Sequence, residues 1–303
     1  MLHVAKGEGM ADQSLRSRVA ALQERYQELS DKHADALHEI ALAELPEAVH
    51  QSNAIENSTL TLTDTEQILQ GRVPVGKRDL RELFEATNLA SVTKELLGSD
   101  DEFTPALILH WHGMLLRGIR DDIAGRYRRA GEWVHVGGHV GANPEFIAEL
   151  VNDALAQCRR DIAADPIDAV ARFHCEFEVI HPFVDGNGRI GRVLMNKQLR
   201  DARLPPVILR AKERHTQYYP LLERYARSDE HQGMARYLSL LLMEALHKRI
   251  AMLESRRIVP LTAWAKARAM TPQAASNKAK RQTIAAFRVR GRWMIAEDEP
   301  AHS

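Results

Sequence analysis

The chain has 303 residues, of which 45% are hydrophobic, so it can bury a substantial core, enough for one large domain and one or two small ones. No apolar run approaches the roughly 18 residues of a membrane span. The amino terminus also lacks the apolar core of a signal peptide, so we expect a cytoplasmic protein with no membrane partner. The formal net charge is zero, but ten Lys or Arg and no Asp or Glu lie between Arg256 and Arg292, which indicates a basic module on a more acidic body.

The amino-terminal region is expected to be helical after an unstructured extension over residues 1–10. Apolar residues recur at threes and fours from Leu15 to Leu45, which predicts one long amphipathic helix that Pro46 interrupts. Cys158 and Cys175 lack the spacing of a metal site and are expected to be buried thiols. Further helices are predicted from Thr63 or Asp64, over 75–98 ending at Gly98, and over 104–119, 144–163 and 166–180.

Two short segments depart from the helical pattern. Trp133, Val134 and Val136 lead into the turn Gly137-Gly138, which predicts a small β-hairpin. The carboxy-terminal segment has a different order: a short helix from Thr262, a turn, a second helix capped by Thr271 with Pro272 at its first position, and strand-like alternation around Arg290-Gly291. This order is typical of a winged helix-turn-helix.

The segment "HPFVDGNGRIGR", residues 181–192, contains a match to G-x-G-x-x-G, the dinucleotide-binding fingerprint. A Rossmann fold needs a strand directly before the glycines and alternating βαβ units around them. Here the preceding apolar residues recur at helical spacing, and Pro182 lies where the strand should run. A dehydrogenase is therefore disfavoured, and the segment is expected to be a loop between two helices.

The loop has the residues of a phosphate site. Gly186 and Gly188 allow the backbone N–H groups to turn inward at the start of a helix, where unsatisfied donors and the helix dipole favour an anion. Arg189 and Arg192, three residues apart, can each bind phosphate oxygens.

Two further side chains suit chemistry on a bound nucleotide. Asp185 offers one hard carboxylate ligand, which suits Mg²⁺ shared with substrate phosphates. His181, with a usual pKa near neutrality, can take a proton from an attacking hydroxyl. The set indicates hydroxyl attack on a nucleotide phosphate.

At every specified position the loop resembles the signature of the Fic family, H-x-F-x-[D/E]-G-N-G-R-x-x-R. The likeness extends through "LHWHGMLLRGIRDDIAGRYRRAGEWVHVGG" and covers roughly residues 45–250. It implies a mainly α fold with a small hairpin flap, and transfer of AMP from ATP to a Ser, Thr or Tyr hydroxyl of a target protein. The expected divisions are a helical region over 1–104, a Fic core over 105–254 and a winged helix-turn-helix over 255–303.

The resemblance implies a role for each loop residue. His181 would be the general base, Phe183 an anchor in the core, and Asp185 the Mg²⁺ ligand. Gly188 favours AMP transfer, because members that phosphorylate their targets carry Lys there. The implied nucleotide-binding residues are Gly186, Asn187 and Gly188 as the anion hole, with the Asn187 side chain included, and Arg189 and Arg192 for the β- and γ-phosphates. Apart from the resemblance, Tyr218 and Tyr219 are aromatic candidates for a wall of the adenine pocket, with core packing as the equal alternative.

"SNAIEN", residues 52–57, matches the family's inhibitory pattern [S/T]-x-x-x-E-[G/N]. Ser52 and Glu56 are four residues apart and lie on one helix face, with Asn57 completing the motif. Glu56 could pair with Arg192 and remove its grip on the γ-phosphate. This hypothesis predicts a nearly silent wild type and an active Glu56→Gly variant. In some relatives the equivalent Glu instead orients a water that removes AMP, and the sequence does not separate the two.

Partners are expected on three surfaces. The hairpin at 131–141 resembles the family's flap, which adds a strand to an extended segment of the protein target. The basic module at 255–303 is expected to contact DNA or a protein, and a dimer through the amino-terminal helix is an alternative to simple packing. The competing function for the whole chain is a DNA-binding regulator whose Fic core only senses nucleotide. His110 and His112 are not expected to bind a metal, because residues two apart face different sides of a helix.

Overall fold

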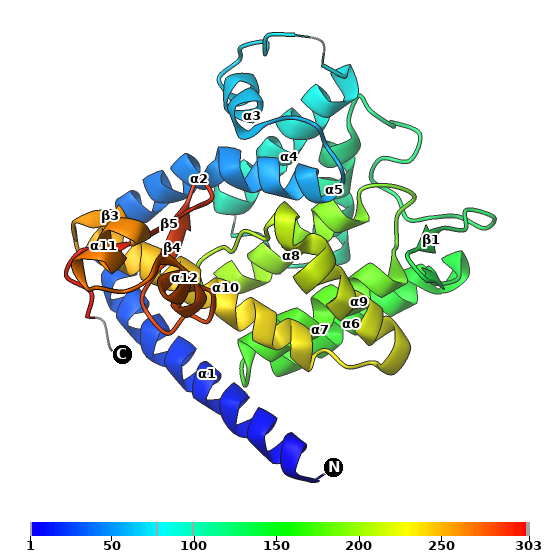
Figure 1. The fold of residues 1–303 in the computed structure, drawn as a ribbon. Coiled ribbons are helices and arrows are strands. Elements are labelled where there is room, and N and C mark those ends of the chain that lie inside the picture. Colours follow the sequence, from blue (N-terminus) through cyan, green and yellow to red (C-terminus); the bar gives the residue numbers. More distant parts are fainter. Residues whose placement is uncertain (1, 77, 99, 301–303) are drawn as a thin grey trace. The chain divides into compact units, whose positions relative to one another are not determined.

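A computed structural model of the chain describes residues 2–76, 78–98 and 100–300, with side chains from Ser14 onward. The protein is mainly helical, as Figure 1 shows. It divides into two compact units, which are described separately. The larger unit comprises residues 41–202 and 208–235, and the smaller unit comprises residues 1–40, 203–207 and 236–303.

Two helices take the place of the single long helix expected at the amino terminus. Helix α1 spans Leu2–Ser30 and α2 spans Ala34–Ile55, so the break lies at 31–33, and Pro46 lies inside α2. The buried side chains on both sides of Pro46, Leu45 and Val49, explain why α2 continues, because packing outweighs one lost backbone hydrogen bond. The expectation of an unstructured extension is wrong for residues 2–10, which have no proline to stop α1; residue 1 lies outside the described residues.

Helices of the larger unit begin at the capping residues that their sequences supply. Thr61 caps α3 in a reciprocal capping box with Asp64, so α3 starts earlier than the predicted Thr63 or Asp64. Thr104 caps α5 and Asp165 caps α7, each with a proline at the first helical position. The helices are α3 (Leu62–Leu69), α4 (Leu80–Gly98), α5 (Pro105–Leu116), α6 (Ile147–Asp161), α7 (Pro166–Ile180), α8 (Asn187–Asp201) and α9 (Tyr219–Ser228), with short 3₁₀ turns at Pro144–Phe146 and Ala211–Glu213 and a π-helical turn at Arg214–Tyr218. Helix α10 (Gln232–Leu253) begins in the larger unit and belongs to the smaller unit from residue 236 onward.

One hydrophobic core lies at the centre of the larger unit. Helix α7 packs against α6 and α8, and α4 packs against α5 (Figure 1). Trp111, Phe173, Phe177 and Phe183 are buried in this core. The predicted hairpin is confirmed: β1 (His135–Val136) pairs antiparallel with β2 (His139–Val140). Both cysteines are buried and unpaired, as expected.

The smaller unit ends in a compact α/β segment. Strand β3 (Ile258–Pro260) precedes α11 (Leu261–Ala267) and α12 (Pro272–Lys280), and β4 (Phe287–Val289) and β5 (Arg292–Ala296) follow. The antiparallel sheet has the order β3-β5-β4. The two helices and the hairpin agree with the prediction, whereas β3 was not predicted, because three residues ending in proline give no alternation to detect. Among the described residues no helix combines the length and apolarity that crossing a membrane would require.

Candidate functional site

The geometry of the candidate site begins where α7 ends. Asp165 and Pro166 fix the start of α7, and Phe173 and Phe177 bury its inner face. His181 adopts a left-handed conformation, with φ of 51°, and Pro182 follows it, so the helix cannot continue. A non-glycine residue held in this conformation by its surroundings is a common feature of functional sites.

The loop after α7 is fixed in the core by two ring systems. Phe183 is fully buried and stacks on His112 with 3.7 Å between ring centroids. The N–H of Gly125 donates to His112 Nδ1 at 3.0 Å, so His112 Nε2 carries the proton and donates to the Asp185 carbonyl at 3.0 Å. Burial lowers the pKa of His112 to about 4, which keeps this ring neutral. His112 is therefore a brace of the loop.

Asn187 has a different position from the one expected. Its side-chain oxygen accepts from the N–H of Phe183 at 2.8 Å, and its Nδ2 donates to the Phe183 carbonyl at 2.8 Å. Both polar ends of the amide therefore close the loop on itself. The side chain thus serves to close the turn, and the anion-hole role that the resemblance implies for Asn187 stays a prediction.

The start of α8 forms an open cradle of backbone donors. Gly186 is the N-cap, with φ of 83°, and no side chain caps the helix. The first intrahelical bond of this turn runs from Ile190 to the Gly186 carbonyl. The N–H groups of Asn187, Gly188 and Arg189 precede it and have no partner within the helix, which is the arrangement that binds anions at helix N-termini.

His181 is oriented and neutral beside this cradle. Its Nδ1 donates to the Glu178 carbonyl at 3.1 Å, which leaves Nε2 as the acceptor of the ring. Burial lowers the pKa of His181 to about 4, and the nearby Arg128 acts in the same direction against the hydrogen bond to Glu178. The ring can therefore accept a proton at neutral pH.

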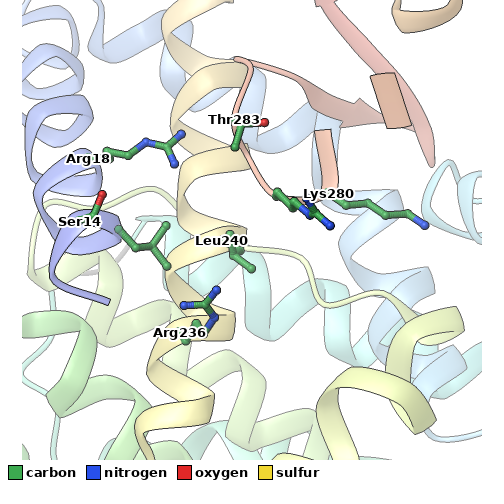
Figure 2. Close-up of a pocket in the computed structure, with 8 residues that line it drawn as sticks. Ser14, Arg18, Arg236, Leu240, Lys280 and Thr283 are labelled. Atoms are coloured by element: carbon green, nitrogen blue, oxygen red, sulfur yellow. The ribbon is translucent and has the colours of Figure 1, made fainter. Parts of the chain in front are cut away.

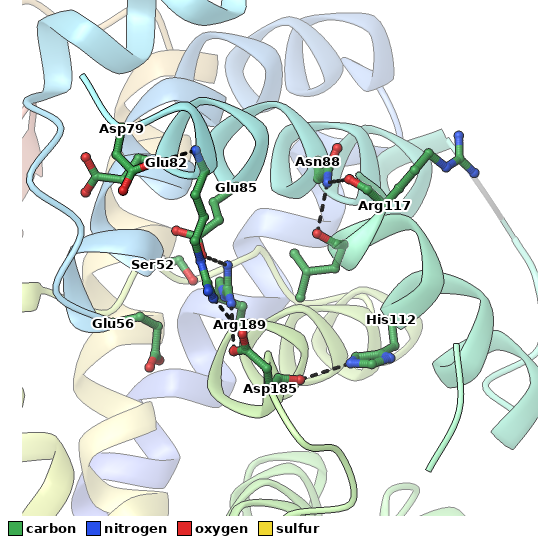
Figure 3. A network of polar contacts seen from close by, with 12 residues as sticks. Ser52, Glu56, Asp79, Glu82, Glu85, Asn88, His112, Arg117, Asp185 and Arg189 are labelled. Carbon is green, nitrogen blue, oxygen red and sulfur yellow. Dashed lines mark hydrogen bonds and ion pairs between the residues drawn. The ribbon is translucent and has the colours of Figure 1, made fainter. Parts of the chain in front are cut away.

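Asp185 is part of a closed ring of alternating charges in which two arginines each contact two carboxylates (Figure 3). Arg81 donates to Asp185 Oδ2 at 2.6 Å and to Glu85 at 3.0 Å. Arg189 contacts Asp185 Oδ1 at 3.1 Å and Glu85 at 3.0 Å. Burial disfavours the charged form of Asp185, but Arg189 and Arg81 outweigh it and hold the pKa of this carboxyl below its usual value. Arg189, whose side chain is 3% exposed, thus braces two carboxylates, whereas the resemblance implied a phosphate contact for it.

Arg192 is held by the segment that the sequence singled out upstream. Its Nε donates to the Ser52 hydroxyl, and its Nη2 donates both to the Ser52 carbonyl and to Glu56 Oε1, all at 2.9 Å. The Arg192 side chain is 5% exposed and that of Glu56 is 39% exposed. A Cβ on Gly188 would lie 2.4 Å from Glu56 Oε1, so glycine at 188 is what admits this carboxylate to the start of α8.

The end of α2 explains the sequence of the upstream motif. The Asn57 N–H donates to the Ala54 carbonyl, and the Ser58 N–H donates to the Asn53 carbonyl, which is a Schellman motif. Asn57 has φ of 69°, so Asn or Gly is favoured at this position, and Glu56 is the C-cap of the helix. A carboxylate at the negative end of a helix is unfavourable in itself, so its contact with Arg192 is what favours Glu at this position.

Tyr218 and Tyr219 lie where the π-helical turn at Arg214–Tyr218 meets α9. Tyr218 is 2% exposed, and its hydroxyl is 2.8 Å from His174 Nε2. The Tyr219 hydroxyl donates to the Ile55 carbonyl at 3.0 Å. In this structure Tyr218 therefore packs in the core beside His174, and Tyr219 packs against the end of α2. These positions correspond to core packing, which was the alternative to a place beside the adenine.

Glu178 is a buried carboxyl that the sequence did not reveal. A Cβ on Gly191 would lie 2.5 Å from Glu178 Oε1, so only glycine leaves room for it. Burial raises the pKa of Glu178 to about 7; Arg192 opposes this shift and Glu56 adds to it.

The raised pKa of Glu178 predicts a pH-dependent stability. Between the usual pKa of 4.5 and about 7, the folded protein holds a proton that the unfolded chain releases, so the free energy of unfolding falls as pH rises through this window. Glu178→Gln removes the effect, and the variant gains on the order of 3 kcal/mol over wild type above pH 7. Urea unfolding of both proteins across this range measures the difference, and a difference independent of pH would contradict the assignment. His181 titrates with the opposite sign, so the comparison with the variant is needed to isolate Glu178.

Arg128 connects the hairpin to the loop. It is 2% exposed and donates to four backbone carbonyls: His181 at 2.8 Å, Glu132 at 2.9 Å, Ala142 at 2.7 Å and Ile180 at 3.2 Å. These bonds hold the base of the hairpin against the residue after α7. The cluster "GRYRR" contains this residue, but nothing in its spacing distinguishes Arg128 from its neighbours.

We expect Arg128→Lys to lower the free energy of unfolding by about 3 kcal/mol, because an ammonium cannot reach all four carbonyls and buried acceptors lose their partners. Arg129→Lys, at an exposed position next to it, is the matched control and should change stability by less than about 0.5 kcal/mol. Denaturant unfolding with both variants measures this. Equal effects would show that Arg128 has no special structural role.

Comparison with known proteins shows which family the residues around this site resemble. Residues 102–199 match the Fic/DOC family. The chain therefore carries a Fic domain. A protein adenylyltransferase Fic from Aedes aegypti is 33% identical over 58% of this chain and 36% of its own length, and one from Nematostella vectensis is 32% identical over 70% of this chain and 53% of its own length. A solved structure of Fic-1 from C. elegans superposes with a TM-score of 0.71 at 26% identity, covering 83% of this chain and 76% of that one.

The matched residues include the loop, the hairpin and α8 as far as residue 199, whereas the segment 52–57 lies outside them. The chain spans about half or less of the length of these two curated relatives. The fold expected from the loop, helical with a small hairpin, is that of the solved Fic protein.

Proposed function

We propose that this chain is a protein adenylyltransferase, which transfers AMP from ATP to a Ser, Thr or Tyr hydroxyl of a protein. The observation that carries the proposal is the uncapped start of α8 beside the neutral ring of His181. An open set of backbone donors suits phosphates, and a neutral imidazole suits a hydroxyl nucleophile. The relatives named protein adenylyltransferase support the same chemistry.

In the proposed reaction the target hydroxyl attacks the α-phosphorus of ATP. Its proton passes to His181 Nε2, a new oxygen–phosphorus bond forms, and the bond from the α-phosphorus to the bridging oxygen breaks, releasing pyrophosphate. The N–H groups at the start of α8 would stabilise charge that develops on the phosphates. Arg192 would bind the departing phosphates once it leaves Ser52 and Glu56, because a guanidinium matches phosphate oxygens in a bidentate geometry.

Asp185 is the residue that would hold Mg²⁺. It fits this role because its carboxyl is ionised and partly exposed at the phosphate cradle, and Mg²⁺ usually takes one or two carboxylates together with substrate phosphates. The ion would neutralise phosphate charge. Among the described residues no group of three or more His, Cys, Asp or Glu converges on a metal site, so substrate phosphates would have to supply the other ligands.

Arg81 competes for this carboxylate, so Arg81→Gln should bind Mg²⁺ more tightly. The Arg81 side chain is 48% exposed, and an exposed pair contributes up to about 1 kcal/mol, so we expect about a fivefold gain. Calorimetric titration of the ATP complex with Mg²⁺ measures the affinity directly. Arg117→Gln is the control, because Figure 3 shows this side chain beside Asn88 and pointing away from Asp185. An unchanged affinity would show that Arg81 does not occupy the metal position.

The hairpin is proposed to bind the target. Trp133 and Val140 are 55% and 50% exposed, and among the described strands β1 and β2 pair only with each other. An extended segment could add to such an edge through main-chain hydrogen bonds, which orient a hydroxyl without reading much sequence.

We also propose that Ser52, Glu56 and Asn57 form an inhibitory element. The three hydrogen bonds to Arg192 occupy the donors that phosphates would use. In the alternative, Glu56 would orient a water that removes AMP from a modified protein.

Labelled ATP tests the reaction class. Wild type and Glu56→Gly are incubated with Mg²⁺, a cell lysate and ATP labelled at either the α- or the γ-phosphate. Protein-bound label from the α position alone supports AMP transfer. Label from the γ position would show phosphorylation and overturn the interpretation of Gly188. Release of AMP from a previously modified protein by wild type would favour the removal reaction.

The carboxy-terminal module is proposed to be a winged helix over residues 255–303, following the proposed divisions at 1–104 and 105–254. The order β3, α11, α12, β4, β5 supports it, and Gln273 and Asn277 on α12 are exposed amides of the kind that read adenine in DNA. DNA contact remains the proposal for this module, and a steep salt dependence of DNA binding would support it. Homodimerisation and a cytoplasmic location remain predictions from the sequence.

A further inference from the structure

A hollow of about 260 Å³ in the smaller unit is lined by four cations and no acid. It is enclosed by α1, by α10 and by the residues at the end of α12, as Figure 2 shows. Arg18 lies on α1, Arg236 on α10, and Lys280 and Arg281 at the end of α12.

Among the described residues, three of the four cations around this hollow have no acidic side chain as a partner. Arg18 donates to the Gln282 carbonyl, and among the side chains that the structure describes neither Arg18, Lys280 nor Arg281 has a carboxylate partner. Elsewhere in the same unit arginines are paired: Arg288 contacts Glu244 at 2.7 Å, and Arg256 contacts Asp298 at 2.7 Å. Burial without an acidic partner also lowers the pKa of Arg18. Within the described chain, the clustering of three cations without a carboxylate partner, Arg18, Lys280 and Arg281, is therefore local.

We propose that this hollow binds a small phosphate-bearing anion. Guanidinium groups bind phosphate oxygens in a bidentate fork, and an anion among like charges removes their mutual repulsion. Leu15 and Leu240 add an apolar surface, which suits a phosphate ester with a small organic part as well as free phosphate. The volume is below the usual range of about 300–1,000 Å³ for drug-sized ligands, so the ligand is small.

The site would join three elements that are distant in sequence, because one ligand contacts α1, α10 and the end of α12. Binding should therefore stabilise the folded smaller unit, by the linkage that applies to any ligand of the native state. This inference is independent of the proposed reaction, since none of these residues belongs to the Fic loop.

The test is calorimetric titration of the full chain at constant ionic strength with inorganic phosphate and with phenyl phosphate. We expect Arg18→Gln and Arg281→Gln each to weaken binding about tenfold, which is the loss of one charge-assisted contact. Lys278→Gln, a change of the same charge on α12 outside the hollow, is the matched control and should bind as wild type does. Tighter binding of phenyl phosphate would identify an organic ester as the ligand class, and equal binding would identify the free anion.

The N–H groups at the start of α8 could also bind phosphate, so the number of phosphates bound per chain distinguishes that site from the hollow. Wild type should bind two phosphates, and the variant with both Arg18→Gln and Arg281→Gln should bind one. Arg281 is exposed, so Arg281→Gln alone keeps the test valid if Arg18→Gln does not fold. Unchanged affinity and stoichiometry in the variants, or an equal rise in melting temperature with chloride, would overturn the proposal.

Discussion

Glu56→Gly should transfer AMP about 10- to 100-fold faster than wild type. A hydrogen bond to a charged group contributes about 1.5–3 kcal/mol, and each 1.4 kcal/mol corresponds to a factor of ten. Loss of the contact between Glu56 and Arg192 releases one Nη2 donor from inhibition. The 39% exposure of the Glu56 side chain favours the lower part of this range, because solvent screens the pair.

Two further variants separate charge from shape. Glu56→Gln keeps a hydrogen-bond acceptor near Arg192 but removes the charge, so it should give an intermediate rate. Ser52→Ala removes the hydroxyl that accepts from Arg192 Nε, a contact worth about 1.5 kcal/mol at least, so roughly a tenfold rise is expected. Incorporation of α-labelled AMP at saturating ATP measures all three.

The stability of these variants should change little. Glu56 lies at the C-cap of α2, outside the helix interior, where a negative charge is unfavourable, so its removal offsets the backbone flexibility that glycine adds. A melting temperature close to that of wild type would show that a faster reaction reflects release of Arg192. A wild type as active as Glu56→Gly would contradict the inhibitory role.

Local sequence signals predicted most of the elements near the site. The spacing of apolar residues gave α7 and α8, and the glycines of the loop indicated an open helix start, because both are properties of neighbouring residues. Pro46 misled the prediction of the first break, since a proline penalty of about 3 kcal/mol can be outweighed by buried neighbours that only the folded chain brings together.

Long-range contacts could not be predicted in the same way. Arg128 reaches carbonyls more than 50 residues away, and Arg81 pairs with a carboxylate 104 residues further along. Asn187 illustrates a different reason: its motif position suggested an outward role, but the turn needs its amide to close the backbone around Phe183. Such roles depend on which groups the folded backbone leaves unsatisfied, and a single sequence does not carry that information.

His181→Ala, introduced into Glu56→Gly, should reduce AMP transfer about 100- to 10,000-fold, which is the usual contribution of a general base. The left-handed conformation at this position complicates the test, because Ala costs about 1–2 kcal/mol there. His181→Asn is therefore the better-matched variant, since Asn tolerates the conformation and lacks a basic ring nitrogen. Both should keep ATP binding, because the phosphate donors belong to α8.

The pH profile of Glu56→Gly gives an independent test of the base. A base acts in its neutral form, and the pKa of His181 is lowered to about 4, so transfer should be nearly constant around neutral pH and fall only as pH decreases toward 4. The nearby Glu56 carboxylate raises this pKa, so its removal should shift the acidic limb further down. A limb near pH 6.5 would show that the ring is solvated in the active form, and full activity of His181→Asn would assign the proton to another group.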